Sequence, residues 1–509
     1  MNLQQFMNEY GAVIIAALAT AMWWGTFKSS LHMFQLNSYR ADTHFKWLSK
    51  PSNLLKVCFS DFKNAKKPLV YTNRVKRMIV TAHILYIASG VAVSAFAAYL
   101  FGVVTGYPIL LVTALAPWFP IAVNSLNAPF EKFNNNRYIN DARRIIKDMP
   151  GLTTIGITGS YGKTSTKFFL HKLLSAKYET LPTPESYNTT LGVVKTVRND
   201  LLPTHEMFVC EMGMKWKGDI AEICDIVQPE HAMITSIGPQ HLESMKTLEN
   251  IIEEKFSITD TITDGKIFLN FDNEYIRNHP KAKQGNVVSY GLTPGAEQAD
   301  ERSEAVPRKW DYSAENVTVS ESGTAFTVRH NDETCDFSTA LVGTHNICNI
   351  VGAIAVAHSL GVQMSELVLP VKRLEAIPHR LEVKGGGDMV IIDDSFNSNP
   401  AGAAAALDVL FSFAKQGRTR ILITPGMVEL GEKQEQLNRE LGEKAAACCD
   451  YAVLIGEKQT APIREGLLGA GFDAARVKTF PTFNEGMEFA KSLDGCKAVL
   501  IENDLPDNY

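Results

Sequence analysis

Apolar residues are distributed in two different ways along this chain of 509 residues. Before residue 130 they form three runs that carry almost no charge, Gly11–Thr26, Met78–Val104 and Tyr107–Leu126. A membrane-spanning helix needs about 20 consecutive apolar residues. The runs therefore predict about three transmembrane helices within residues 1–130. The first run is the shortest and also resembles the core of a signal peptide, although no small-residue cleavage site follows it.

Charge predicts the orientation of these helices. Between Phe27 and Arg77 there are eleven Lys and Arg residues against two acids. Basic loops stay in the cytoplasm, so the second span runs outward and the third returns after a turn at Thr105–Gly106. Such a basic loop also attracts anionic lipid headgroups, which makes membrane lipid an expected partner. The sequence thus predicts a multi-pass plasma-membrane protein whose remaining domains are cytoplasmic.

From Thr153 onward the pattern changes to short β-branched runs that alternate with amphipathic helical patterns. TTIGIT precedes KTSTKFFLHKLLSAK, for example, and MVIID precedes PAGAAAALDVLFSFAK. This alternation predicts α/β domains with parallel sheets covered by helices on both faces. A charged stretch, Ala296–Lys309, predicts an exposed loop, and Ile377–Arg380 is the sharpest boundary. The expected parts are a membrane region at 1–130, a central domain at 131–376 and a C-terminal domain at 377–509.

Composition excludes several classes of protein. Hydrophobic residues make up 45% of the chain and charged residues 21%, which excludes a disordered chain. The formal net charge of -5 offers no basic excess for nucleic-acid binding. The eight cysteines form no CxxC pair, so neither a disulfide framework nor a zinc site is expected.

Residues 156–166 read GITGSYGKTST and lie between a predicted strand and a predicted helix. Two glycines allow the tight turn that points backbone N–H groups at phosphate oxygens, and the helix adds its positive N-terminus. Lys163 would neutralise phosphate charge, and the Thr164 hydroxyl would bind magnesium. Ile157 stands where the ordinary P-loop has glycine, so this is the shorter GxxGKT form. The expected ATP-contacting residues here are Gly159, Ser160, Gly162, Lys163, Thr164 and Ser165.

Further motifs follow in a fixed order: PESYNTTLGV (184–193), CEMGMKWKGDI (210–220), ITSIGPQHLESM (234–245), EEKFSI (253–258), GTHNICNIVGA (343–353), IPHRLEV (377–383) and IIDDSFNSNP (391–400). With the phosphate loop, they resemble the Mur ligases, ATP-dependent amide-forming enzymes of peptidoglycan assembly whose superfamily includes folylpolyglutamate synthetases. The resemblance covers about residues 150–509. It implies a P-loop central domain and a Rossmann-like C-terminal domain. IIDDSFNSNP and MVELGEKQEQLNRELGEKAA most resemble the member that adds D-alanyl-D-alanine.

The metal site combines an argument from the residues with this resemblance. Glu211 and His241 each follow an apolar run, which predicts positions at strand ends, where open α/β sheets bind ligands. Both are possible magnesium ligands. Lys255 lies beside a helical apolar stripe and would by default be a solvated surface charge. The resemblance implies instead that Lys255 becomes a carbamate and binds a second magnesium ion. Thr164, Glu211, His241 and Lys255 are thus the expected metal set, and Lys163, Glu211, His241 and Lys255 the expected catalytic set.

The later motifs supply the nucleotide-closing residues that the resemblance implies. Asn346 and Asn349 lie three apart on one helical face and would contact adenine, while Asn346 could also cap the helix. Arg380 would meet the phosphates, and Asp394 the ribose or the magnesium shell. The last domain would close over the substrates before chemistry. Asp393 is an alternative to Asp394, since only one of two neighbouring strand residues faces the site.

The resemblance implies an ATP-dependent ligase that forms an amide through an acyl phosphate, and the apolar runs predict that it is anchored in the membrane. It would add an amino acid or a dipeptide to a carboxylate-bearing cell-wall peptide precursor. Three departures leave both substrates open: apolar runs replace the uridine-nucleotide-binding domain, Pro425-Gly426-Met427 replaces Gly-Asp-Met, and IENDLPDNY lacks a lysine-bearing turn. Alternatives are an amino-acid polymer or folylpolyglutamate-type ligase, a membrane P-loop ATPase, and a catalytically idle partner protein.

Overall fold

The computed structural model describes residues 3–59, 68–101, 109–292, 310–320, 323–396 and 398–504. It contains two compact units, one of residues up to Arg137 and one spanning Tyr138–Asp504. The expected turn at Thr105–Gly106 and the expected exposed loop at Ala296–Lys309 lie outside the described residues.

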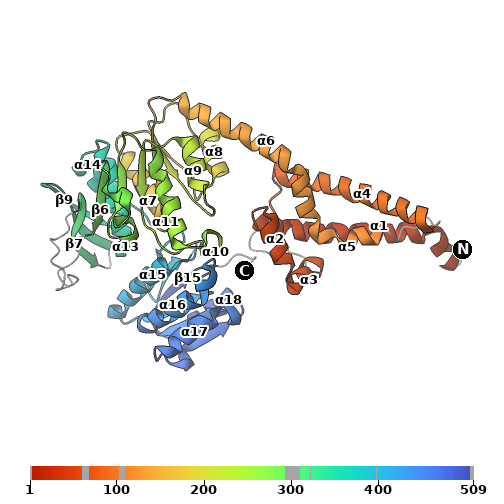
Figure 1. Ribbon diagram of the computed structural model, residues 1–509. Helices are drawn as coiled ribbons and strands as arrows, with labels where there is room; N and C mark the ends of the chain where they lie inside the picture. Colours follow the sequence, from red (N-terminus) through yellow and green to blue (C-terminus); the bar gives the residue numbers. More distant parts are fainter. Residues whose placement is uncertain are drawn as a thin grey trace. The chain divides into compact units, whose positions relative to one another are not determined.

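The first unit is helical (Figure 1). Its helices are α1 (Leu3–Leu36), α2 (Ala41–Leu48), α3 (Pro51–Phe59), α4 (Asn73–Phe101), α5 (Ile109–Ala114), the 3-10 helix η2 (Ala116–Trp118) and the first part of α6 (Phe119–Lys147). Its apolar core combines α1, α4, η2 and α6 through residues such as Trp23, Tyr86 and Phe119. The Trp23 ring stacks on the Tyr86 ring with 4.2 Å between their centroids, which joins α1 to α4.

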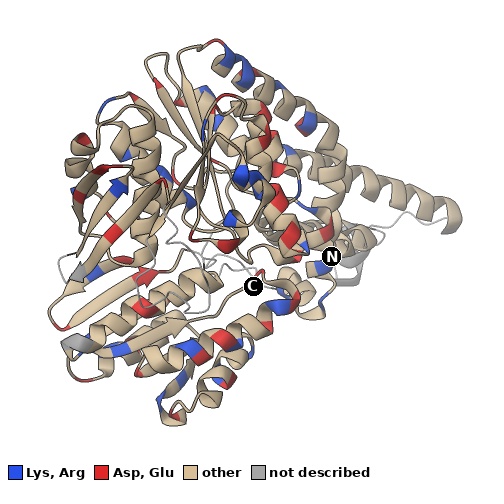
Figure 2. Ribbon diagram, turned by 60° about the vertical axis from the view of Figure 1, so that its left-hand side comes forward, with Lys and Arg blue, Asp and Glu red and all other residues tan. Residues whose placement is uncertain are grey.

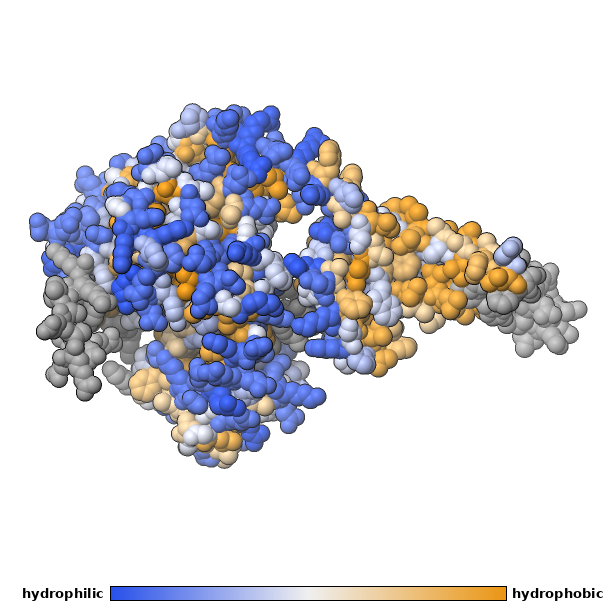
Figure 3. Space-filling model, in the orientation of Figure 1, coloured by the Kyte–Doolittle hydropathy of each residue, from blue (hydrophilic) through white to orange (hydrophobic). Residues whose placement is uncertain are grey.

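Among the helices of the described ranges, one segment, Asn73–Leu100, is long and apolar enough to cross a membrane. The first apolar run of the sequence lies inside α1. The third is divided between residues outside the description and α5, η2 and α6. On α4, Val80, Ile84, Ile87 and Val91 form one helical face and are 59% to 65% exposed. Figure 3 shows an apolar surface over the first unit, whereas Figure 2 shows charges of both signs spread over the second.

The second unit holds two sheets. The nine-stranded sheet has the order β2-β3-β1-β4-β5-β6-β7-β8-β9. Its strands are β1 (Thr153–Thr158), β2 (Thr180–Pro182), β3 (Met207–Glu211), β4 (His231–Ile234), β5 (Ile267–Asn270), β6 (Val287–Leu292), β7 (Tyr312–Ser320), β8 (Gly323–His330) and β9 (Glu333–Thr339). From β2 to β7 all pairs are parallel, as predicted, but β7–β8 and β8–β9 are antiparallel. The prediction of a purely parallel sheet is wrong at these strands, because connections as short as the turn between β8 and β9 can join only antiparallel neighbours.

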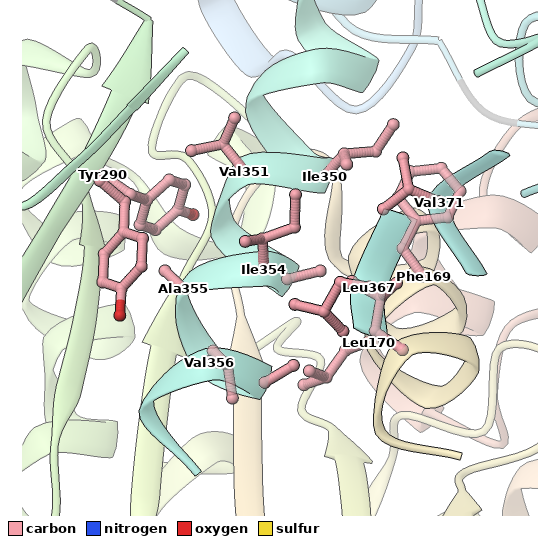
Figure 4. Close-up of a cluster of buried hydrophobic side chains, with 14 of the residues drawn as sticks. Phe169, Leu170, Tyr290, Ile350, Val351, Ile354, Ala355, Val356, Leu367 and Val371 are labelled. Carbon is pink, nitrogen blue, oxygen red and sulfur yellow. The ribbon is translucent and has the colours of Figure 1, made fainter. Parts of the chain in front are cut away.

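Helices cover both faces of this sheet. One core contains residues of α7 (Lys163–Leu174), α13 (Thr344–Ser359) and α14 (Met364–Lys372), and the other contains residues of α8 (Thr190–Asn199), α9 (Asp219–Val227) and α11 (Leu248–Phe256). Shorter helices are α10 (Leu242–Met245), α12 (Glu274–Arg277), η3 (Ser257–Thr261) and η4 (Pro280–Lys283). Figure 4 shows α13 between Tyr290 on one side and Phe169, Leu170 and Leu367 on the other. Residues 346–357 of this central helix are buried. The helix therefore packs against the sheet and against α7 and α14 within one core.

The six-stranded sheet has the order β10-β11-β15-β12-β13-β14. Its strands are β10 (Glu382–Gly386), β11 (Met389–Asp394), β12 (Thr419–Thr424), β13 (Tyr451–Ile455), β14 (Val477–Phe480) and β15 (Lys497–Glu502). Only the edge strand β10 pairs antiparallel; the other described pairs are parallel, as predicted. The covering helices are α15 (Pro400–Ser412), η6 (Phe413–Gln416), η7 (Gly431–Lys433), α16 (Gln434–Cys448), α17 (Glu457–Gly469), η8 (Ala474–Arg476) and α18 (Phe483–Ser492).

Candidate active site

The phosphate loop joins β1 to α7 through two glycines that no other residue could replace without strain. Gly162 caps α7 with a φ of 79°, and a Cβ there would lie 2.6 Å from the Asn349 Oδ1 atom. A Cβ on Gly159 would lie 2.1 Å from Thr235 Oγ1. Backbone N–H groups at the start of α7 have no partner within the helix, so this turn can receive phosphate oxygens.

A second loop, which follows β4, holds the phosphate loop in place. The Ser160 N–H donates to the Ser236 carbonyl at 2.7 Å. The Ser160 hydroxyl donates to the Gly238 carbonyl at 3.0 Å and accepts from the Gly238 N–H at 3.1 Å. The Tyr161 hydroxyl donates to the Pro239 carbonyl at 3.1 Å. The side chain of Ser160, predicted to contact ATP, therefore serves to hold the loop, while Ser165 is half-buried in the first turn of α7.

The Lys163 side chain folds back over the phosphate loop, which directly precedes it in the chain. Its ammonium donates to the Gly159 carbonyl at 2.6 Å and to the Ser160 carbonyl at 3.4 Å. Burial lowers the pKa of Lys163 to about 8, and the nearby Glu211 carboxylate opposes that shift. The side chain is therefore mostly protonated at neutral pH and can neutralise phosphate charge.

Glu211, the last residue of β3, is the centre of a buried polar cluster. Its Oε1 atom accepts from Thr164 Oγ1 at 3.1 Å and from Asn188 Nδ2 at 2.9 Å, and Lys167 Nζ lies 3.1 Å from Oε2. Burial raises the pKa of Glu211, but Lys167 and Lys163 outweigh it, so the net pKa is lowered. Two of the predicted metal ligands, Thr164 and Glu211, thus present neighbouring hard oxygens. Such a pair fits magnesium, which takes one or two protein oxygens together with phosphates and water.

Lys167 and Asn188 are site residues that the sequence analysis did not single out. The Lys167 side chain is fully buried beside Glu211, and burial lowers its pKa against the opposing effect of that carboxylate. The available signal was spacing, because Lys167 follows Lys163 by one helical turn within GKTSTK, on the same helix face. Asn188 stood inside the PESYNTTLGV motif without an assigned role.

Lys255 is not a solvated surface charge. It lies in α11 with 1% of its surface exposed, and burial lowers its pKa well below the ordinary value, with a further contribution from Lys163. Its neighbour Glu254 accepts from the N–H groups of Gly218 and Ile220 at 2.8 and 3.0 Å, so that carboxylate is committed to the start of α9. Lys255 and Lys163 therefore share one electrostatic environment.

His241 lies farther along the chain than the predicted strand end. β4 ends at Ile234, and His241 is the N-cap of α10 with a φ of 54°. Its Nδ1 atom lies 2.8 Å from Glu429 Oε2. Among the described residues, no three His, Cys, Asp or Glu side chains form a group that could hold a metal ion. Of the predicted metal set, the structure brings Thr164 and Glu211 into contact.

The two asparagines of α13 have different surroundings. The N-cap of α13 is Gly343, and the Asn346 amide donates to the Val342 carbonyl at 2.8 Å, so the alternative that Asn346 caps this helix is wrong. The Asn349 amide lies against Gly162 of the phosphate loop. Both side chains are nearly buried.

Arg380 and Asp394 approach the same site from the C-terminal part of the chain. The Arg380 guanidinium lies 4.2 Å from the centroid of the Phe396 ring. Burial lowers its pKa, whereas Glu211 and Asp394 oppose that shift. Burial raises the pKa of Asp394 to about 6, and its Oδ1 atom accepts from the Leu381 N–H at 3.0 Å.

The neighbouring acid is engaged elsewhere. Asp393 Oδ2 lies 2.8 Å from His379 Nδ1 and 2.9 Å from Lys384 Nζ. Of the two candidates, Asp394 is therefore the one that interacts with Arg380.

The fold and this cluster define a P-loop α/β nucleotide-binding protein with a second α/β domain. Residues 157–357 match the Mur ligase middle domain, and residues 379–501 match the Mur ligase, glutamate ligase domain. Together the two matches cover more than half of the sequence, and the chain belongs to the Mur ligase family.

Individual relatives are more distant. The chain is 29% identical over 332 residues to the UDP-N-acetylmuramoyl-tripeptide--D-alanyl-D-alanine ligase of Bacillus subtilis, which covers 65% of this chain and 66% of the relative. Its Escherichia coli counterpart is 29% identical over 310 residues, covering 60% and 65%. The chain thus spans about two thirds of the length of these relatives.

Solved structures show the same fold. The structure of MurF from Acinetobacter baumannii has a TM-score of 0.63 at 24% identity and covers 72% of this chain and 77% of its own. MurF from Thermotoga maritima in complex with ADP has a TM-score of 0.61 at 23% identity and covers 73% and 80%.

Proposed function

We propose that this protein is a membrane-anchored, ATP- and magnesium-dependent amide ligase of the Mur type. It joins an amino acid or dipeptide to a carboxylate of a cell-wall peptide precursor at the cytoplasmic face. The observation that carries this proposal is the contact between Thr164 and Glu211 directly after the phosphate loop, with Lys163 beside them. Cations and hard oxygens around a phosphate loop are what phosphoryl transfer requires.

The reaction has two steps. A carboxylate oxygen of the precursor attacks the γ-phosphorus of ATP, which forms an acyl phosphate and releases ADP. The amine then attacks the acyl carbon, a proton is lost, and phosphate leaves. Lys163 and Arg380 would neutralise phosphate charge, while Thr164 and Glu211 would hold the metal. Magnesium, when bound, supplies charge neutralisation at the phosphates.

We also propose that Lys255 carries a carbamate. A neutral amine attacks carbon dioxide, and loss of one proton leaves an anionic carbamate that can bind a second magnesium ion. The low pKa and burial of Lys255 support this proposal because they favour the neutral, nucleophilic amine. The Lys163 cation would attract the negative charge of the carbamate, whereas it repels the positive charge of a protonated Lys255.

Similarity to the D-alanyl-D-alanine ligases supports a dipeptide as the amine substrate. The family matches say less about the identity of the carboxylate substrate, because neither match includes the first 156 residues. The sequence departures lie at the carboxyl ends of two strands, Pro425-Gly426-Met427 after β12 and Glu502-Asn503 at β15. Ligands bind at such strand ends in open α/β sheets, so these departures bear on substrate choice. Both lipid-linked and nucleotide-linked precursors therefore belong in the test.

We propose that the first unit anchors the enzyme in the plasma membrane through several spans. The exposed apolar face of α4 and its length support one span. The excess of basic residues between Phe27 and Arg77 supports a cytoplasmic location for the catalytic domains.

Phosphate release by the purified protein tests the function. The assay contains ATP, magnesium and a panel of amines with lipid-linked or nucleotide-linked precursors. We expect release that depends on one carboxylate–amine pair, together with a product heavier than the precursor by the amine minus water. Lys163→Met should abolish it. Steady release that is indifferent to every pair would instead identify a membrane ATPase.

A further inference from the structure

The turn that follows β12 brings one carboxylate to two side chains of the central domain. Glu429 lies in this turn with a left-handed φ of 63°. Its Oε2 atom is 2.8 Å from His241 Nδ1, and its Oε1 atom is 3.3 Å from Lys215 Nζ. A non-glycine residue with positive φ is uncommon and is maintained when surrounding contacts require it. The left-handed backbone thus holds the carboxylate at its contact with His241.

The contact determines which nitrogen of His241 remains available. A carboxylate accepts hydrogen bonds, so the proton shared with Glu429 lies on Nδ1. The Nε2 atom of the neutral ring then keeps its lone pair and can bind a ligand. Histidines that bind metal ions commonly donate their other N–H to a carboxylate, which fixes the ring and increases its basicity.

The chain places His241 two residues after a segment that contacts the phosphate loop. His241 follows the segment from Ser236 to Pro239, which exchanges hydrogen bonds with Ser160 and Tyr161. Glu429, by contrast, belongs to the turn between β12 and α16 of the other sheet. The hydrogen bond between Glu429 and His241 therefore joins the part of the chain that holds the phosphate loop to the part that holds the second sheet.

We infer that Glu429 is a positioning residue that orients His241 for metal binding and thereby couples contact between the two domains to the affinity of the site for a divalent cation. The inference rests on the proposed magnesium-dependent function. Its readout, however, is cation binding, so it can fail or succeed separately from ligase activity.

Mn²⁺ binding to the full-length protein, followed by electron paramagnetic resonance with a non-hydrolysable ATP analogue, tests the inference. Loss of a carboxylate that supports a metal-binding histidine typically weakens metal affinity by about 10–100-fold. We expect Glu429→Gln to weaken Mn²⁺ binding by about tenfold or more, with affinity for the analogue in the absence of metal changed less than about twofold. Unchanged Mn²⁺ affinity in this variant would overturn the inference.

Two matched variants separate orientation of the ring from loss of charge. Glu432→Gln removes a carboxylate from the same turn, and Lys215→Gln removes the second partner of Glu429. We expect Mn²⁺ affinity to change less than about twofold in both. An effect of either variant equal to that of Glu429→Gln would assign the loss to general electrostatics and overturn the inference.

A double-mutant cycle completes the test. If Glu429 acts through the histidine, Glu429→Gln should weaken Mn²⁺ binding little further in a His241→Gln background. Fully additive losses would show that the two residues act independently and would contradict the inference. Thermal unfolding of each variant checks that the fold is intact.

Discussion

Lys255 and Lys167 are both buried lysines, but their neighbours give them different chemistry. Lys167 is paired directly with Glu211 at 3.1 Å, so its charge is balanced within the protein. Lys255 lies near the Lys163 cation, which adds to the effect of burial in lowering its pKa. The Glu254 carboxylate opposes this shift but does not outweigh burial and Lys163, so the environment favours the neutral amine. The lysine proposed to carry the carbamate is thus the one whose surroundings disfavour its charge.

We expect Lys255→Ala to lower kcat by about 100-fold, equivalent to roughly 2.7 kcal/mol in the barrier. The reason is that the variant cannot form the proposed carbamate, which would supply an anionic oxygen ligand. Short carboxylic acids such as acetate should restore part of the activity, because they can supply that oxygen in the space left by the side chain. Steady-state kinetics with and without acetate measure both effects. Wild-type turnover in Lys255→Ala, or no rescue at any acetate concentration, would exclude the carbamate.

At the residue scale, the phosphate loop of the candidate site was predictable from the sequence, whereas most of its contacts were not. The motif GSYGKT identified the loop because glycine, lysine and threonine at those spacings have direct consequences for phosphate binding. It could not show that Ser160 bonds to Gly238, since that partner lies 78 residues away. Nor could it show Glu429 beside His241, which lie 188 residues apart and meet only through packing of two sheets.

At the scale of elements, α13 shows how closely helix and sheet approach. A Cβ on Gly352 would lie 2.4 Å from the Met233 Cε atom and 2.7 Å from the Tyr290 ring. Glycine at this position thus permits the close approach of α13 to the sheet, because any side chain would push the helix and the sheet apart. Its neighbours in α13 fill the remaining space, as Figure 4 shows for Val351 and Ile354.

We expect Gly352→Ala to lower the free energy of unfolding by about 1–3 kcal/mol through overpacking. Gly469→Ala is the matched control, because a Cβ there meets nothing within 4 Å, and it should be neutral or stabilising by up to about 1 kcal/mol. Urea unfolding followed by circular dichroism measures both. Equal stabilities of the two variants would contradict the close packing of α13.

In the first unit, His44 connects α2 to α1 and η2. The Asn37 amide donates to His44 Nδ1 at 3.3 Å, and His44 Nε2 lies 3.0 Å from the Ser30 hydroxyl, which donates to the Pro117 carbonyl at 2.5 Å. Burial lowers the pKa of His44 from 6.5 to about 4, and the Pro117 carbonyl partly opposes this shift. The folded unit therefore holds a neutral histidine.

A group whose folded pKa is depressed in this way binds protons more readily when unfolded. The stability that it contributes is present above pH 6.5 and is lost as pH falls from 6.5 to about 4, by roughly 3 kcal/mol at most. We expect thermal unfolding of the full chain in detergent, followed by tryptophan fluorescence, to show this loss. The slope with pH should be smaller in His44→Gln, and an unchanged slope would exclude a buried neutral histidine.

The elements themselves were mostly predictable, because β-branched runs and amphipathic patterns carry their own periodicity. TTIGIT, MVIID and YAVLIG all became strands at the expected places. The antiparallel strands β8 and β9 were missed, since their alternating polar residues interrupt the strand–helix alternation. His241 was predicted at a strand end but lies at the start of α10. The length of an irregular loop leaves no pattern in the sequence, so this difference could not be predicted.

At the scale of the whole molecule, α6 begins in the first unit and ends in the second. Ile139 and Ala142 of its last turns are buried in the core formed with α8 and α9. The Arg198 guanidinium lies 4.4 Å from the centroid of the Tyr138 ring. The catalytic unit thus includes the end of a helix that starts among apolar residues.

We expect a fragment that begins at residue 131 to be soluble without detergent and to keep ATP binding. A fragment that begins at residue 148 should be less stable by several kcal/mol, because it loses Ile139 and Ala142 from the core. Thermal unfolding and size-exclusion chromatography of the two fragments measure this difference. Equal stability would show that α6 adds nothing to the catalytic unit.

The hydrogen bonds between Ser160 and Gly238 also bear on the order of folding. The phosphate loop is completed by a segment that follows β4, so its geometry exists only after β1 and β4 have paired. Intermediates without that pairing would lack the nucleotide pocket. ATP would then stabilise only the fully assembled sheet, and mass action would draw partly folded chains toward it. In a cell, the substrate would act on this enzyme as a folding ligand before it acts as a reactant.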